Sequence, residues 1–221
     1  MTSAALRAAD CFRSSKFLHG YARGKTRWDP AYPTVAQILR SSPHPLLDIG
    51  CGIGLLAAYL REEGLTQPIF GIEPDAKKVA SALRSVLPRY HGLAFQTGDA
   101  RSLEPFSGDI VLLDILHYLA PDEQQSVLLS VAGRMAPDGI ALIRTTFRDR
   151  SWRYYATLLE EGVVRATGWI RGGRCHFPTR CEVESAFPSP RFAVTSRPMW
   201  GHTPFNSHLV EVRRIGEPLH C

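Results

Sequence analysis

One short stretch, LLDIGCGIG at residues 46–54, combines an acid with three alternating glycines, a pattern suited to binding a ligand. The apolar residues that end at Asp48 are typical of a buried strand, and the apolar residues after Gly54 recur with a helical period. Glycines allow a tight turn between the two elements, and a helix N-terminus presents N–H groups to a ligand. Since open α/β sheets bind ligands at the carboxyl ends of their strands, the stretch predicts a nucleotide-like ligand at this turn.

The spacing of the glycines distinguishes two kinds of nucleotide site. A dinucleotide fingerprint, G-x-G-x-x-G, would need a glycine at position 55, where this chain has Leu55. The observed G-x-G-x-G, with Asp48 two residues ahead of it, instead resembles the first motif of class I S-adenosylmethionine-dependent methyltransferases. This resemblance implies S-adenosylmethionine as cofactor, S-adenosylhomocysteine as product, and cofactor contacts from Asp48, Gly50, Cys51, Gly52 and Gly54.

Two further acids follow the next two predicted strands at the spacing of that family. Glu73 in IFGIEPD, with Pro74 beside it, can accept from both hydroxyls of a ribose, because a carboxylate accepts hydrogen bonds in a fork. The resemblance implies that Asp99 in QTGDARSL accepts from the adenine amino group, with Ala100 against the ring. Either acid alone could instead cap the next turn or helix. The fourth predicted strand, in GDIVLLDILHYL, adds Asp114 to the implied cofactor contacts.

Strand and helix patterns alternate along most of the chain. Helical spacing predicts helices at 53–63, 75–87, 122–135 and 151–162, and another that begins near Pro178. Short apolar runs predict strands at 45–49, 68–72, 92–96, 109–113, 139–145, 191–197 and 207–213, the last two forming an antiparallel hairpin. This order predicts an α/β fold: a doubly wound, Rossmann-like methyltransferase sheet, mostly parallel with a C-terminal antiparallel hairpin, and with helices on both faces.

Length and composition predict one globular domain in the cytoplasm, with no membrane partner. A chain of 221 residues, 44% of them hydrophobic, is long enough for a single buried core. It has no apolar stretch of 18 residues and no apolar secretion signal, and its five cysteines are scattered as reduced thiols would be. Within the domain we expect lid helices, a cofactor-binding core, a substrate cap and a strand hairpin at 1–43, 44–149, 150–190 and 191–221.

Basic and aromatic side chains concentrate in the two segments expected to cover the cofactor. Residues 1–40 carry seven basic and two acidic side chains, and residues 144–180 carry eight arginines and three acids. A site framed by these cations would attract an anion, and the interspersed aromatic rings suit a flat one. The alternative is an ordinary solvated surface or core packing. The predicted substrate contacts are Trp28, Tyr118, Arg148, Trp152, Tyr155, Arg171 and Arg174.

Two histidines are candidate general bases for a hydroxyl acceptor. His117 follows the fourth predicted strand, and imidazole exchanges protons near neutral pH. His176, in the arginine-rich segment, is the competing candidate. From the predicted lid, either Lys25 or Arg23 is placed to reach the cofactor's carboxylate, and Tyr21 is placed to help close the site. We expect no metal, because two threonines stand at 145–146, where metal-dependent catechol methyltransferases have an Asp-Asn pair.

A second resemblance concerns the methyl acceptor. The stretches HGYARGKTRWDPAYP, GWIRGGRCHFPT and PFNSHLVEVRR resemble bacterial methyltransferases that accompany aryl polyene and xanthomonadin-type pigment biosynthesis. This resemblance implies methyl transfer, in secondary metabolism, to an anionic phenolic head group, free or attached to an acyl carrier protein. Two alternatives remain open: an RNA methyltransferase, suggested by the pI of 9.1, and a non-catalytic S-adenosylmethionine-binding partner protein.

Overall fold

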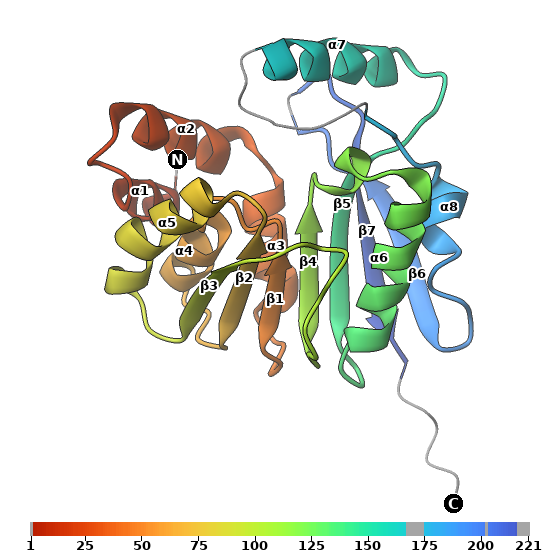
Figure 1. Cartoon of the computed structure of the whole chain (residues 1–221), viewed down its shortest axis with the longest axis horizontal. Helices are drawn as coiled ribbons and strands as arrows, with labels where there is room; N and C mark the ends of the chain where they lie inside the picture. The colour runs from red at the N-terminus through yellow and green to blue at the C-terminus, as the bar shows by residue number, and fades with distance from the viewer. Residues whose placement is uncertain (1, 167–174, 202, 216–221) are drawn as a thin grey trace, which may run out of the picture. The chain divides into compact units, whose positions relative to one another are not determined.

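Seven strands pair in the order β3-β2-β1-β4-β5-β7-β6 in the computed structural model, which describes residues 2–166, 175–201 and 203–215 (Figure 1). Strands β1, β2 and β3 are parallel, whereas β7 runs antiparallel to both β5 and β6. Each strand lies within one residue of its predicted bounds. The Rossmann-like α/β fold and the C-terminal antiparallel hairpin predicted from the sequence are therefore confirmed.

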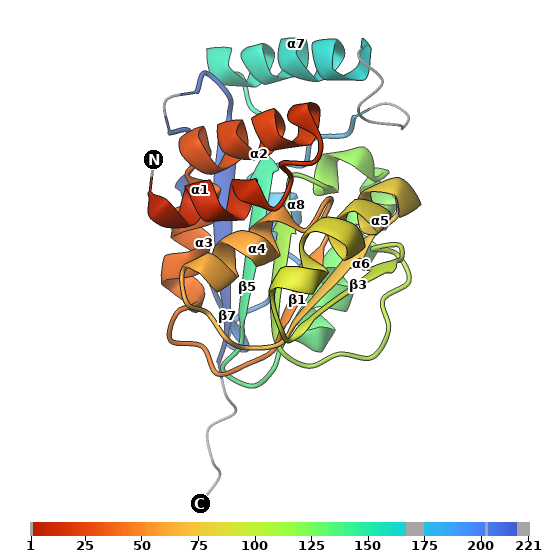
Figure 2. The same ribbon diagram turned by 90° about the vertical axis from the view of Figure 1, so that its left-hand side faces the viewer.

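The chain folds as two compact units, Met1–Val111 and Leu112–Cys221, and the boundary falls within β4 (Asp109–Leu113). In the first unit, α1 packs against α2 and α4, and α5 packs on β2 and β3 (Figure 2). The elements of the first unit are α1 (Ser3–Asp10), α2 (Lys16–Trp28), α3 (Ala31–Leu39), β1 (Leu46–Ile49), α4 (Leu55–Glu62), β2 (Ile69–Glu73), α5 (Ala76–Ser85), the 3₁₀ helix η1 (Leu87–Arg89) and β3 (Leu93–Thr97).

Local side chains fix where these helices begin. Ser15 Oγ accepts from the Leu18 amide at the start of α2, and Asp75 Oδ1 accepts from the Lys77 amide at the start of α5. Every residue of β1 is buried, as expected of a strand with neighbours on both sides. The parallel register pairs Asp48 with Gly71, so the acid that precedes the glycine turn stands at a fixed position in the sheet.

In the described residues of the second unit, the remaining strands are accompanied by four helices, one of them a 3₁₀ helix. All seven residues of β5 are buried, and β5 pairs with β7 over its whole length. Within the described residues of the chain, no helix is both long and apolar enough to cross a membrane. The elements of this unit are the 3₁₀ helix η2 (Leu116–Tyr118), α6 (Pro121–Arg134), β5 (Ile140–Thr146), α7 (Trp152–Ala166), α8 (Arg180–Glu184), β6 (Phe192–Pro198) and β7 (Ser207–Arg214).

Candidate active site

The glycine turn after β1 has the backbone conformation that its sequence predicts. Gly50, Gly52 and Gly54 have φ angles of 80°, 56° and 77°, in the left-handed region that favours glycine. A Cβ at Gly54 would also lie 3.0 Å from Phe95 and 3.1 Å from Ala82, whereas a Cβ at Gly52 would meet no atom within 4 Å. The turn is thus packed behind Gly54 and open at Gly52, which leaves room for a ligand there.

Two buried acids lie at this turn. Asp48 is 3% exposed, and its Oδ2 has no hydrogen-bond partner among the described residues. Burial, together with the nearby charge of Glu73, raises the pKa of Asp48 to about 7. Glu73 accepts from the backbone amides of Gly52, at 3.1 Å, and Asp75, at 3.2 Å. An unpaired buried carboxylate oxygen is costly, so Asp48 fits a cationic ligand such as S-adenosylmethionine, with its sulfonium and ammonium groups.

The other predicted cofactor contacts of the first unit differ in burial and in their hydrogen-bond partners. Cys51 is buried, and burial raises the pKa of its thiol. Pro74 is exposed and Ala100 half-buried. Asp99 accepts from the Arg101 backbone amide at 2.9 Å and pairs with its guanidinium at 2.5 Å, and these bonds lower the pKa of Asp99. The turn-capping alternative therefore describes Asp99 in this structure, and its adenine contact remains a prediction.

The predicted lid residues lie on α2. Lys25 Nζ pairs with Asp29 Oδ2 at 3.1 Å, across the C-terminal end of the helix, so a cofactor carboxylate would have to compete with this ion pair. Tyr21 is half-buried. Trp28 is 59% exposed, with the guanidinium of Arg27 4.8 Å from the centre of its ring. An exposed aromatic ring beside a cation suits a flat anionic ligand, which is the role predicted for Trp28.

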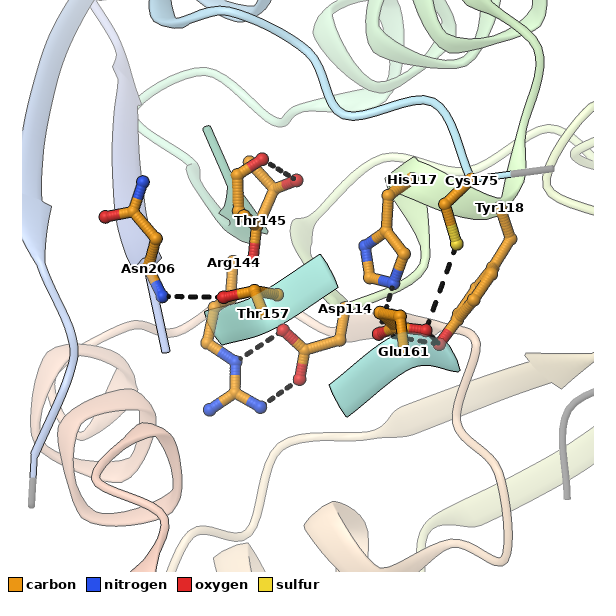
Figure 3. A network of polar contacts seen from close by, with 10 residues as sticks. Asp114, His117, Tyr118, Arg144, Thr145, Thr157, Glu161, Cys175 and Asn206 are labelled. Atoms are coloured by element: carbon orange, nitrogen blue, oxygen red, sulfur yellow. Dashed lines mark hydrogen bonds and ion pairs between the residues drawn. The ribbon is translucent and has the colours of Figure 1, made fainter. Parts of the chain in front are cut away.

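In the second unit, Asp114 follows β4 with an unusual backbone conformation. Its φ of 59° is tolerated by aspartate better than by most residues with a side chain. Its carboxylate binds the guanidinium of Arg144 through both oxygens, one of them at 2.8 Å, and its amide donates to the Arg144 carbonyl (Figure 3). Arg144 is buried on β5. The structure thus gives Asp114 the role of partner to a buried arginine, while its predicted cofactor contact remains untested.

A polar cluster surrounds the candidate base His117 on η2 (Figure 3). Its Nε2 lies 3.3 Å from Glu161 Oε1, within ion-pair distance, although the atoms are not aligned as a hydrogen bond. Glu161, on α7, also accepts from the Tyr118 hydroxyl at 3.3 Å and lies 3.9 Å from the Cys175 sulfur. Burial disfavours the Glu161 charge, but the His117 ring and the Tyr118 hydroxyl outweigh burial and lower the pKa of Glu161. Burial and the Glu161 charge raise the pKa of Tyr118.

Aromatic rings enclose the same histidine. Phe177 stacks on His117 with ring centres 5.2 Å apart, and the Tyr118 ring lies 4.1 Å away. His117 is only 3% exposed, so an acceptor can reach the ring only if a neighbouring side chain shifts. His176, the competing base, joins this cluster through its backbone, whose amide donates to the His117 carbonyl. His117 is therefore surrounded by two aromatic rings as well as by the Glu161 carboxylate.

Helix α7 turns Thr157 and Glu161 inward and leaves Trp152, Tyr155 and Leu159 exposed. Thr157 is buried, and its Oγ1 accepts from the Asn206 amide at 2.9 Å, one turn before Glu161 (Figure 3). Trp152 and Tyr155, two predicted substrate contacts, are 64% and 60% exposed, which excludes the core-packing alternative for them.

The predicted arginines of this segment are only partly described. Arg148 pairs with Glu182 at 3.4 Å, and more than half of each side chain is exposed, so the pair contributes little to stability and can open to an anion. Arg171 and Arg174 lie outside the described residues. Among the residues that are described, no cluster of three or more His, Cys, Asp or Glu side chains could hold a metal ion.

The sequence analysis missed Glu161 and Arg144 as parts of the site. Glu161 belongs to EEG within a helical pattern, where an acid is normally a solvated surface residue. Arg144 sits in the apolar strand run GIALIRT, and an arginine inside a fully buried strand is the one signal that a carboxylate partner should exist nearby.

Comparisons with known proteins agree with this geometry. Residues 46–139 match the family model of a methyltransferase domain. A ubiquinone biosynthesis O-methyltransferase of Rhodopseudomonas palustris (strain TIE-1) is 26% identical over 157 residues, 69% of this chain and 59% of that protein. One from Rickettsia prowazekii (strain Madrid E) is 25% identical over 130 residues, 57% of this chain and 48% of that protein. The matches therefore span about half to three-fifths of these relatives' lengths.

Solved structures show the same fold. Magnesium protoporphyrin IX methyltransferase from Synechocystis PCC 6803, with bound S-adenosylhomocysteine, has a TM-score of 0.67 at 18% identity, covering 94% of this chain and 93% of that one. An O-methyltransferase family protein from Burkholderia thailandensis has a TM-score of 0.66 at 19% identity, covering 97% and 64%. The predicted S-adenosylmethionine-dependent methyltransferase fold is thereby confirmed.

Proposed function

We propose that this protein is an enzyme that methylates a small, anionic, phenolic acceptor with S-adenosylmethionine. The match of residues 46–139 to the family model of a methyltransferase domain and the Rossmann-like methyltransferase fold support this proposal. The observation that carries this proposal is the buried cluster around His117, in which a histidine is enclosed by aromatic rings and faced by a carboxylate. A hydroxyl acceptor needs a group that removes its proton, and this cluster supplies one.

The first unit supplies the cofactor residues of this proposal. When bound, S-adenosylmethionine provides an electrophilic methyl group on a positively charged sulfur. Asp48 and Glu73 would hold it, with the turn at Gly52 leaving space for its backbone approach. Burial strengthens the attraction between the Asp48 carboxylate and a cation, because there is little water to screen the charges. Asp99 and Lys25 would contact the cofactor after exchanging their present partners, Arg101 and Asp29.

The second unit supplies the acceptor residues. His117 accepts the hydroxyl proton, and its Nδ1, which has no hydrogen-bond partner among the described residues, is the ring atom available for this transfer. The resulting imidazolium is stabilised by Glu161. Tyr118 and Phe177 suit the flat face of an aromatic ring. Arg148 suits the acceptor's negative charge, since its exposed pair with Glu182 can exchange for a ligand carboxylate.

The finer identity of the acceptor follows from the sequence resemblance. Likeness to aryl polyene and xanthomonadin-type enzymes supports a hydroxybenzoate-like head group as acceptor. The basic residues of the 144–180 segment support the alternative that this head group is attached to an acidic acyl carrier protein. Two relatives named as ubiquinone biosynthesis O-methyltransferases support oxygen as the methylated atom. The lid, core, cap and hairpin assignments of residues 1–43, 44–149, 150–190 and 191–221 are part of the same proposal.

Transfer of a radiolabelled methyl group from S-adenosylmethionine tests this function directly. Hydroxybenzoic acids, free and carrier-bound, should be labelled, and His117→Ala should reduce the rate by about 100-fold or more. His91→Ala, at an exposed histidine, is the matched control and should leave the rate unchanged. Labelling of RNA and of no phenolic acid would favour the RNA alternative. Cofactor binding without transfer to any acceptor would favour the non-catalytic alternative.

A further inference from the structure

Arg153, near the start of α7, donates to the Thr203 carbonyl at 2.6 Å. Two further polar contacts dock this helix on its own unit, and one of them ends on the candidate base (Figure 3). The first is the hydrogen bond from the Asn206 backbone amide to Thr157 Oγ1. Asn206 is 1% exposed and also donates to the Phe147 carbonyl and to Asp149, so this anchor is well fixed. The second contact is the Glu161 carboxylate, one helical turn further on, shared by Tyr118, His117 and Cys175.

An inward-facing carboxylate is unusual on a helix whose outer face is aromatic. A helix that packed by burying apolar surface would turn Trp152, Tyr155 and Leu159 inward, yet these are 64%, 60% and 74% exposed. Thr157 and Glu161 face inward instead and are satisfied by partners on other segments. The docking of α7 therefore combines these polar contacts with the Tyr154 ring, whose centre lies 5.7 Å from that of Phe177. Losing a buried polar contact should loosen the helix.

We infer that Glu161 is a positioning residue whose carboxylate makes proton acceptance by His117 depend on the docking of α7. This inference rests on the proposed role of His117 as base. With α7 docked, the carboxylate lies 3.3 Å from Nε2 and stabilises the positive ring. With α7 displaced, the ring loses this counter-charge. His117 is 3% exposed, and Glu161 of α7 is one of the side chains that cover its ring, so a shift of α7 would both expose the ring and remove its counter-charge.

Other groups around the ring do not replace Glu161. Tyr118, from η2, donates its hydroxyl to Glu161 and carries no charge, because burial and Glu161 raise its pKa. Cys175 places its thiol on the same carboxylate, and Phe177 is apolar. Gln124, from α6, donates to the His176 carbonyl. The Asp114 carboxylate is bound to Arg144. Glu161 is thus the carboxylate that these described segments aim at the ring.

Three variants test the inference. Glu161→Gln keeps an oxygen for the Tyr118 hydroxyl and removes the charge. Thr157→Val removes the Asn206 anchor without touching the cluster. Glu184→Gln, an acid on α8 that lies 3.9 Å from Arg180, controls for loss of a negative charge elsewhere in the unit. Each variant is measured by the pH dependence of methyl transfer and by amide hydrogen exchange of residues 152–162.

We expect Glu161→Gln to lower the maximal rate by about tenfold or more and to move the acid limb of the pH–rate profile to lower pH, because the imidazolium loses its counter-charge. Thr157→Val should shift the limb in the same direction by less. Both should speed exchange in α7 by about tenfold, and Glu184→Gln should change neither quantity.

The inference is overturned if Glu161→Gln lowers the rate equally at every pH, or if Thr157→Val speeds α7 exchange and leaves the limb in place. The exchange measurement needs no acceptor. If no acceptor is methylated, the proposed function fails, while unchanged α7 exchange in Glu161→Gln would separately refute the docking role.

Discussion

The two units of this protein build their functional groups in opposite ways. In the first unit, the residues of the glycine turn are nearly contiguous in sequence: β1 ends at Ile49, directly after Asp48, and three glycines with positive φ lead into α4. In the second unit, the cluster around His117 combines residues of η2, α7 and the segment at 175–177. Tyr118 and Glu161, for example, are 43 residues apart in the sequence. A site formed by the backbone of one turn can be predicted from the local sequence. A site formed by side chains of distant segments depends on tertiary packing.

In the first unit, a single substitution should greatly weaken cofactor binding without unfolding the protein. Asp48→Asn should weaken S-adenosylmethionine binding by about 100-fold, since a charge-assisted interaction with a cation is lost. The change is isosteric, so α4 and the glycine turn should be retained. Calorimetric titration of the cofactor measures the loss, and circular dichroism checks the fold. An unchanged affinity would show that Asp48 is merely a buried structural acid.

In the second unit, the largest effect should be on stability. Asp114→Ala leaves the Arg144 guanidinium buried without its carboxylate and places alanine at a φ of 59°, so the free energy of unfolding should fall by about 2–3 kcal/mol. Urea denaturation measures the fall. The double variant Asp114→Ala/Arg144→Leu is the control and should recover much of it, because the buried charge is gone. Equal losses in the two variants would contradict the pairing argument.

The acid at the cofactor turn should also make stability depend on pH. The pKa of Asp48 is about 7 in the folded protein and ordinarily 3.8, so the folded state holds a proton that the unfolded state has released between those values. The contribution of Asp48 to stability without cofactor should therefore be full below about pH 4 and be lost as pH rises through about 7. Melting temperatures should fall by a few degrees between pH 5 and pH 8, and Asp48→Asn should show less decline. A wild-type curve that rises over this range would contradict the assignment.

The smallest effect concerns the outer face of α7. Trp152 is mostly exposed, so Trp152→Ala should change the free energy of unfolding by no more than about 0.5 kcal/mol. The KM for the acceptor should also stay unchanged, because the inward face of α7 carries Thr157 and Glu161 instead. Steady-state kinetics measures the KM, with Leu159→Ala, at another exposed apolar residue of α7, as the control. A raised KM for Trp152→Ala alone would support the acceptor contact predicted from the sequence.

These contrasts explain which features could be predicted from sequence. The strands and the glycine turn follow from short apolar runs and from glycine's access to positive φ, and both were placed within one residue. His117 was found because it directly follows a strand end. Glu161 could not be found, because its approach to His117 is set by how α7 packs, and an acid in a helix is ordinarily solvent-facing. Arg101, the partner of Asp99, was missed because a turn's internal pairing has no periodic signal.

We expect the first unit to bind S-adenosylmethionine through the acids at its glycine turn. Calorimetric titration with S-adenosylmethionine and S-adenosylhomocysteine measures this binding in the wild-type protein, in Glu73→Ala, and in Glu104→Ala as an exposed acidic control. Micromolar binding by the wild type and Glu104→Ala, lost in Glu73→Ala, is the predicted result. Absence of binding by the wild type, or undiminished binding by Glu73→Ala, would contradict it.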